Sequence, residues 1–122
     1  MVMNESERQK IIEAAKFLED KGYTKSMDDY SVIYSNKVIE FIIGYERYDV
    51  TCDINIRFIK QNKFYVVGWI AVVRSDLNVD VYKGIKNLLL LLSYIKDNYD
   101  NLIQMDYCEE SRKLIAAYLD NM

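Results

Sequence analysis

The sequence has no histidine and no proline among its 122 residues. Without imidazole, the chain lacks Ser-His and Cys-His nucleophile pairs, the helical zinc-protease motif and histidine-based cleavage of RNA. Any acid–base chemistry must therefore use carboxylates, lysine or tyrosine. Without proline, the turns must rely on Gly, Asn and Asp.

Cysteine is scarce, with Cys52 and Cys108 only. The two are too far apart in sequence for a metal knuckle or a CxxC redox pair. Cys52 is expected on the buried face of a strand, and Cys108 falls near a helix start. With no histidine to act as its base, Cys108 is not expected to be catalytic. The acidic pair Asp28–Asp29 is interpreted as a turn, so the sequence predicts no metal site and no cofactor.

Long apolar runs are also missing. The strongly apolar run Leu88 to Leu92 is far short of the roughly 20 residues that span a bilayer. Residues 1 to 7 are polar and acidic, which is unlike a signal peptide. We therefore expect a cytoplasmic protein with no membrane segment, folded as one α+β domain over residues 1–122.

Between Val32 and Arg74 the sequence predicts four strands separated by short polar turns. In Cys52–Phe58 every second residue is apolar, which is the pattern of a strand with one buried face. The other strands are expected at about residues 30–34, 38–45 and 64–73, and the last is apolar on both faces, which is typical of a central or doubly covered strand. Short links favour antiparallel neighbours, and therefore a meander.

Helical periodicity surrounds this stretch. Apolar residues recur at helical spacing in residues 4–21, 81–97 and 107–120. The expected fold class is α+β: an N-terminal helix, a four-stranded antiparallel meander sheet, and two or three C-terminal helices packed on the sheet.

Two segments combine tyrosine with acidic residues, as protein-binding surfaces often do. The first is the turn Tyr45-Glu46-Arg47-Tyr48-Asp49, and the second is the acidic stretch after Lys96. The candidate partner-binding residues are Tyr45, Glu46, Arg47, Tyr48, Asp49, Asp97, Tyr99, Asp100, Asp106, Tyr107, Glu109 and Glu110. The alternatives are a solvated loop with local ion pairs for the first segment, and helix capping on a wet surface for the second.

The eleven tyrosines of the chain suggest a second kind of partner. Aromatic rings among cations bind single-stranded nucleic acid, and Arg57, Lys60, Lys63, Tyr65 and Arg74 compose such a stripe. The net charge of −3 and the acidic C-terminal third oppose it. We therefore expect a protein partner and no nucleic acid.

The polar face of the sheet offers an enzymatic alternative. Glu40, Asp53 and Arg57 are expected on that face, and two carboxylates close together raise one pKa for acid–base work. A small-molecule-binding or carboxylate-dependent enzyme could use such a pocket. The same residues fit a cross-strand charge pair equally well.

The layout also resembles a known group of proteins. The strings Phe41-Ile42-Ile43-Gly44-Tyr45-Glu46-Arg47-Tyr48, Ile54-Asn55-Ile56-Arg57-Phe58 and Tyr107-Cys108-Glu109-Glu110 follow an N-terminal helix in an arrangement similar to that of small immunity proteins of bacterial polymorphic-toxin systems of the contact-dependent inhibition type. The resemblance implies a cytoplasmic, non-enzymatic protein that binds and neutralises a cognate toxin domain, often a basic nuclease, by covering its active site. No catalytic residues carry over.

Overall fold

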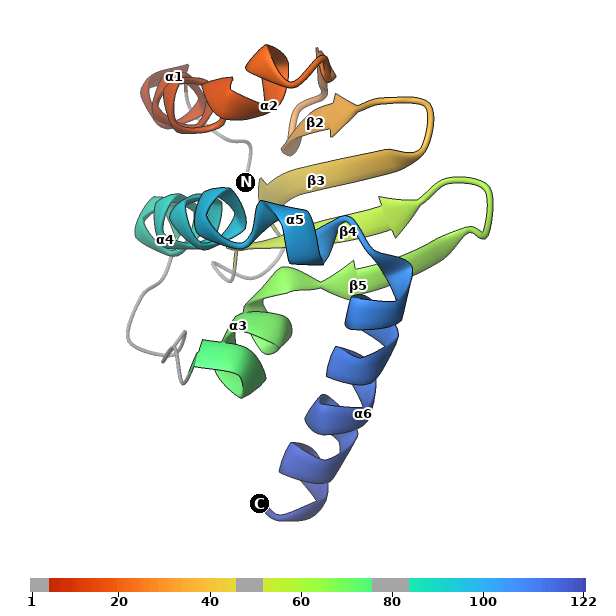
Figure 1. Ribbon diagram of the computed structural model, residues 1–122. Helices are drawn as coiled ribbons and strands as arrows, with labels where there is room; N and C mark the ends of the chain where they lie inside the picture. Colours follow the sequence, from red (N-terminus) through yellow and green to blue (C-terminus); the bar gives the residue numbers. More distant parts are fainter. Residues whose placement is uncertain (1–4, 46–51, 76–83) are drawn as a thin grey trace.

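The computed structural model describes residues 5–45, 52–75 and 84–122, and its architecture is the predicted α+β class (Figure 1). The elements in chain order are α1 (Glu5–Ala14), α2 (Lys16–Asp20), β1 (Thr24–Met27), β2 (Ser31–Ser35), β3 (Ile39–Tyr45), β4 (Cys52–Phe58), β5 (Lys63–Val66), α3 (Val67–Ser75), α4 (Ile85–Asp97), α5 (Tyr99–Leu102) and α6 (Met105–Asp120).

The sheet is an antiparallel meander, as predicted, with strand order β1-β2-β3-β4-β5. It has five strands instead of four. The additional strand is β1, in a segment where the sequence predicted no strand. Its residues are largely exposed, because an edge strand with little cover on either face has no need for alternating apolar residues.

The prediction for the last strand, residues 64–73, was wrong in length and position. Strand β5 ends at Val66 and helix α3 begins at Val67, and β5 is an outer strand of the sheet. Val67, Ile70 and Ala71 are buried, and their spacing of three and four residues is that of a helix. The run is apolar because α3 buries one side, and not because a strand is covered on both faces.

Asn and Asp residues build the turns of this proline-free chain. The Asp28 carboxylate accepts hydrogen bonds from the backbone N–H of Tyr30 at 2.9 Å and of Ser31 at 2.8 Å. The Asn36 side chain accepts from the backbone N–H of Val38 and Ile39, and Asn62 adopts a positive φ of 51° before β5. The interpretation of Asp28–Asp29 as a turn is therefore confirmed for Asp28.

The core lies on one face of the sheet, beneath α1, α2, α4 and α5 (Figure 1). Alternate strand residues point into it, as the periodicity predicted, among them Phe41, Ile43, Ile54 and Ile56. Leu88, Leu91, Leu92 and Ile95 of α4 meet them from the helix layer. The N-terminal helix predicted over residues 4–21 is interrupted at Ala15, which separates α1 from α2.

Helices α3 and α6 pack against each other beside β5, and the end of α6 extends away from the rest of the molecule (Figure 1). The predicted helix over 107–120 begins two residues earlier, at Met105. The start of the helix predicted over 81–97 lies outside the described residues, which show α4 from Ile85 to Asp97.

Candidate functional site

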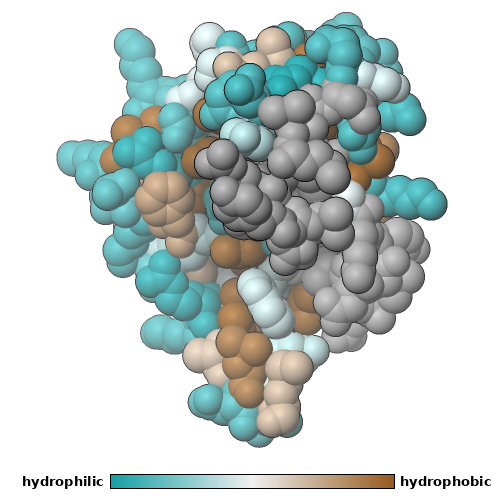
Figure 2. Space-filling view, turned by 180° about the vertical axis from the view of Figure 1, so that it is seen from behind, coloured by the Kyte–Doolittle hydropathy of each residue, from teal (hydrophilic) through white to brown (hydrophobic). Residues whose placement is uncertain are grey.

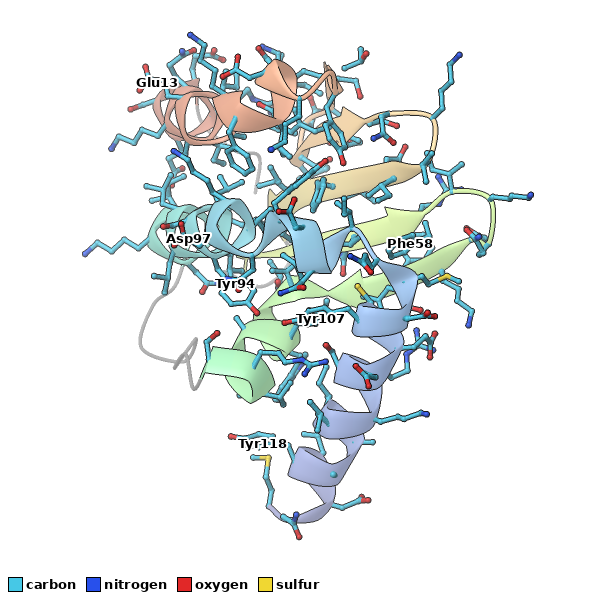
Figure 3. All side chains as sticks on the ribbon, in the orientation of Figure 1. Glu13, Phe58, Tyr94, Asp97, Tyr107 and Tyr118 are labelled. Atoms are coloured by element: carbon cyan, nitrogen blue, oxygen red, sulfur yellow. The ribbon has the colours of Figure 1, made fainter. Side chains whose placement is uncertain are left out.

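The acidic segment after Lys96 divides into free and paired carboxylates. Asp97, Asp100 and Asp106 are exposed and form no ion pair with the described part of the chain. They follow one another at the end of α4, in α5 and in the first turn of α6. In Figure 3 Asp97 points outward from the helix layer. These three side chains are the carboxylates of the predicted site that have no ion pair within the described residues.

Glu109, in contrast, is held by β5. Its carboxylate lies 3.0 Å from Lys63 Nζ and 3.5 Å from an Arg112 guanidinium nitrogen, and it accepts a hydrogen bond from the Tyr65 hydroxyl. The hydrogen bond from Tyr65, and then that from Lys63, lowers the pKa of Glu109 below its usual range. Burial, and then the bond to Glu109, raises the pKa of Tyr65 above its ordinary value. We call Lys63, Tyr65, Glu109 and Arg112 the Glu109 cluster. This cluster joins α6 to the sheet.

Glu110 and Tyr107 are engaged at the contact between α3 and α6. The Arg74 guanidinium lies 3.7 Å from the Glu110 carboxylate and 4.2 Å from the centre of the Tyr107 ring. It also donates to the Ser111 hydroxyl at 3.1 Å. In Figure 3 Tyr94 and Tyr107 lie near each other between α4 and α6, and burial, followed by the Tyr107 hydroxyl, raises the pKa of Tyr94 to about 12. Through Arg74, Tyr107 and Glu110 therefore connect α6 to α3.

Tyr99 borders a shallow polar cavity of about 270 Å³. The Tyr99 hydroxyl lies 2.9 Å from that of Tyr23, and the Lys21 ammonium lies 4.3 Å from the centre of the Tyr99 ring. Burial, and then the hydrogen bond to Tyr99, raises the pKa of Tyr23. The cavity is lined by Lys21, Lys96, Asp97, Asn98, Tyr99, Asp100 and Asn101. Its charges balance, so it presents hydrogen-bonding groups of both signs to a neighbour.

The other predicted segment lies mostly outside the described residues. This holds for Glu46, Arg47, Tyr48 and Asp49, and for the side chain of Tyr45, which ends β3. Tyr45 pairs with Cys52 at one end of the β3–β4 ladder, whereas Phe58 pairs with Lys63, the partner of Glu109, at the other end. Six residues of strand span about 20 Å, so Tyr45 and Glu109 do not belong to one compact cluster.

The structure does not bring together the two carboxylates of the enzymatic alternative. Glu40 lies directly opposite Arg57 in the sheet and forms an ion pair with it at 3.2 Å. Asp53 lies opposite Gly44, four positions further along the same ladder. The expected approach of Glu40 to Asp53 is therefore wrong, and the cross-strand charge pair is the arrangement found for Glu40 and Arg57.

Asp53 supports the start of α3. Its carboxylate accepts hydrogen bonds from the backbone N–H of Gly68 at 3.0 Å and of Ile54 at 2.7 Å. Gly68 lies in the first turn of α3, whose unpaired N–H groups favour a carboxylate. Burial raises the pKa of Asp53 above its usual range, and these two hydrogen bonds oppose the shift. The hydrogen bond from the Gly68 N–H therefore accounts for the position of the Asp53 carboxylate.

The residues of the nucleic-acid stripe are dispersed. Tyr65 is buried beneath Arg112, whose guanidinium lies 4.7 Å from the centre of its ring. Arg74 lies on α3 and contacts Tyr107, away from Arg57 on β4. A continuous row of open rings among cations is not formed by Arg57, Lys60, Lys63, Tyr65 and Arg74.

Cys108 is fully buried, and its thiol contacts the Leu102 carbonyl oxygen at 3.4 Å. Burial raises its pKa to about 12, so the thiol is held in its unreactive protonated form. The side chain of Cys52 is outside the described residues. In the part of the chain that the structure describes, no three His, Cys, Asp or Glu side chains are grouped to hold a metal ion. None of the described helices has the length and apolar character needed to cross a bilayer.

Sequence reasoning missed an exposed apolar surface. Assigning residues 64–73 to a strand covered on both faces hid the exposure of Phe64, Val66 and Trp69. Seen from behind, apolar side chains continue from the lower part of the sheet over α3 and the end of α6 (Figure 2). Val67, Ile70 and Ala71 are three and four residues apart, and this helical spacing could have revealed the helix. The helix in turn places Trp69 on the outer side.

Comparison with protein-family models, curated proteins and solved structures found no match to this chain.

Proposed function

We propose that this chain is a non-enzymatic protein-binding module, and specifically an immunity protein that binds and neutralises a cognate bacterial toxin domain in the cytoplasm. The observation that carries the proposal is the set of exposed carboxylates Asp97, Asp100 and Asp106, which form no ion pair with the described part of the chain. Unpaired surface carboxylates form ion pairs with a basic partner and orient it as it docks.

The surface around these carboxylates also fits a protein partner. The cavity beside Tyr99 presents amide, ammonium and carboxylate groups together, a mixture that side chains of a partner can enter and pair with. A basic domain, such as a nuclease, has the arginine and lysine side chains that these carboxylates bind. The enzymatic alternative has less support, because Glu40, Arg57 and Asp53 each have a structural partner.

The test is retention of the toxin candidate, the product of the reading frame upstream, on the immobilised chain. We expect stoichiometric retention at low salt and release at high salt, because screening weakens pairs at the surface. The triple variant Asp97→Lys, Asp100→Lys and Asp106→Lys is expected to lose at least about tenfold in affinity, since like charges then face each other.

A matched control has the same change in total charge on helices α1 and α2. Glu5, Glu13 and Asp20 are exposed residues of α1 and α2, and their replacement by Lys is expected to leave retention nearly unchanged. An equal loss in both triple variants would show that only total charge matters. No retention of the candidate at low salt would contradict the proposal.

A further inference from the structure

Exposed apolar side chains begin on β5 and α3 and continue along the end of α6 (Figure 2). Phe64, Val66 and Trp69 supply the first part. The Trp69 and Tyr118 rings lie 6.2 Å apart, which connects α3 to α6. We define the apolar stripe as these residues together with Leu114, Tyr118, Leu119 and Met122. Contiguous apolar surface of this kind marks interaction sites.

The apolar stripe has the area that a dimer interface needs. Its side chains are between 36% and 82% exposed. A whole aromatic side chain has about 150–250 Å² of surface and an aliphatic one somewhat less, so these exposed fractions amount to roughly 500 Å² per copy. Because homodimer interfaces are about 65% apolar, this apolar area corresponds to an interface of roughly 800 Å² per copy, the standard size of a specific protein–protein interface.

The two arginines beside Phe64 already have acidic partners within the chain. The Arg57 guanidinium lies 5.7 Å from the centre of the Phe64 ring and 3.2 Å from the Glu40 carboxylate. Arg112 donates a hydrogen bond to the Phe64 carbonyl oxygen at 3.3 Å and lies 3.5 Å from the Glu109 carboxylate. Because these cations are neutralised, this part of the stripe favours an apolar occupant over a charged one.

Along the end of α6, apolar and charged residues lie on different sides of the helix. Leu114, Tyr118 and Met122 are four residues apart, so at 3.6 residues per turn they share one side. Lys113 and Asp120 are seven residues apart and share a side that is turned away from Tyr118. The end of α6 extends away from the rest of the molecule (Figure 1), which makes its apolar side accessible to a second molecule.

We propose that a second copy of this chain covers the apolar stripe, in a two-fold symmetric dimer in which the stripe of one copy lies against the stripe of the other. A two-fold interface brings the same surface of both copies together. An apolar surface of this area, whose neighbouring cations are neutralised, is complementary to itself. The stripe contains none of the carboxylates that carry the proposed function, so the dimer and the toxin-binding site are tested separately.

The dimer and the toxin complex are expected to respond to salt in opposite ways. Each copy has a net charge of −3, so screening reduces the repulsion between two copies. Burial of apolar surface holds the dimer together and is not weakened by screening. Salt is therefore expected to leave the dimer unchanged or to strengthen it, whereas it releases the toxin from surface carboxylates.

The experiment is sedimentation equilibrium of the full chain over about a hundredfold range of concentration, since association depends on concentration by mass action. The mass is expected to rise from 14.5 kDa to twice that value. Trp69 is the only tryptophan in the chain and reports on the interface. Its emission is expected to shift to shorter wavelength over the same range of concentration, because the indole leaves water in the dimer.

Variants locate the interface. Leu119→Lys is expected to weaken the dimer at least about tenfold, because two ammonium groups then enter an apolar interface. Its matched control, Asp120→Asn, makes the same change in charge one residue further on and is expected to dimerise as the parent does. Phe64→Thr retains a good strand former on β5 and is expected to weaken the dimer at least about fivefold. All three positions are exposed, so circular dichroism spectra are expected to match the parent.

Four outcomes would overturn the proposal. A mass of 14.5 kDa at every concentration would show that no second copy covers the stripe, and a dimer unaffected by Leu119→Lys and by Phe64→Thr would have its interface elsewhere. A dimer that dissociates as salt rises would be held by ion pairs. A shift of Trp69 emission on addition of the toxin candidate, together with loss of its retention in Leu119→Lys, would show that the toxin covers the stripe instead.

Discussion

Asp and Asn side chains form turns in this chain that proline and glycine form in many other proteins. Asp28 accepts three hydrogen bonds at the turn between β1 and β2, two from backbone N–H groups and one from the Ser31 hydroxyl. The bond from the Tyr30 N–H, followed by that from the Ser31 hydroxyl, lowers the pKa of Asp28. Asn36 accepts two backbone N–H groups at the next turn. Each side chain thus closes a turn with its own acceptor oxygen.

Glycine is required where a backbone approaches another group closely. A Cβ on Gly68 would lie 2.6 Å from an Asp53 carboxylate oxygen, and a Cβ on Gly44 would lie 2.8 Å from the Tyr30 carbonyl oxygen. Neither position has a positive φ, so the requirement is for space and not for a left-handed backbone. The sequence does not reveal this, because the neighbours of these glycines are distant in sequence.

Gly68→Ala is expected to destabilise the fold by about 1–3 kcal/mol, as is usual when a methyl group is forced into filled space. The new Cβ must displace the Asp53 carboxylate from the Gly68 N–H, so the start of α3 loses its acceptor. Urea unfolding followed by circular dichroism measures the change.

A double-mutant cycle identifies the cause. In an Asp53→Ala background the clashing oxygens are absent, so Gly68→Ala is expected to cost clearly less than in the parent. Equal costs in the two backgrounds would mean that the methyl group meets something other than Asp53.

Among the elements, strands with alternating burial were the most predictable. Strands β3 and β4 each have one face in the core, so their period of two residues is visible in sequence. Strand β1 is nearly all exposed and leaves no such pattern. Helix α3 was hidden because apolar residues occupy both its buried and its exposed positions, Trp69 included.

The candidate site was predictable only in part, because ion pairs join residues that are distant in sequence. Lys63 lies 46 residues before Glu109, and Arg74 lies well before Glu110. From the sequence alone, Glu109 and Glu110 were therefore both expected to be available to a partner. The Glu40–Arg57 pair was one of the two arrangements that the sequence predicted, because adjacent strands of a meander place residues opposite each other.

The Glu109 cluster gives a prediction for α6 as an element. Glu109→Gln removes the charge that Lys63 and Arg112 share, so we expect faster amide hydrogen exchange in the first half of α6. Glu110→Gln is the matched comparison, because Glu110 is largely exposed and has one distant ion pair at 3.7 Å. Its effect is expected to be smaller, and equal exchange in the two variants would contradict a special role for Glu109.

The same cluster predicts a pH dependence with a definite sign. The folded-state pKa of Glu109 lies below its ordinary value, so the folded state binds the proton more weakly than the unfolded state does. The stabilisation is therefore present above the ordinary pKa and is lost as pH falls through the folded-state pKa. The difference in exchange between parent and Glu109→Gln is expected to disappear under acidic conditions.

At the scale of the whole molecule, the body and the end of α6 differ in burial. The core lies between the sheet and the helix layer, whereas residues 116–122 are exposed. A helix that continues beyond the core adds little to folding stability, because few of its side chains leave water there. Substitutions at the end of α6 are therefore expected to change stability little.

Deletion of residues 117–122 is expected to lower the free energy of unfolding by less than about 1 kcal/mol, since it removes mainly exposed side chains. Leu92→Ala in the core is expected to cost about 2–5 kcal/mol. Urea unfolding of both variants provides the comparison. Similar losses would show that the end of α6 belongs to the cooperative core.

The strand order of the sheet matters during synthesis on the ribosome. Because the spatial order equals the sequence order, each new strand emerges beside a partner that has already been made. The helix α4 that covers β4 emerges only after Ile85, so the apolar face of the nascent sheet waits for roughly 30 residues of further translation. At about 5–20 residues per second, that interval lasts a few seconds. During it, the apolar face of the sheet is exposed to solvent and is open to binding by a chaperone.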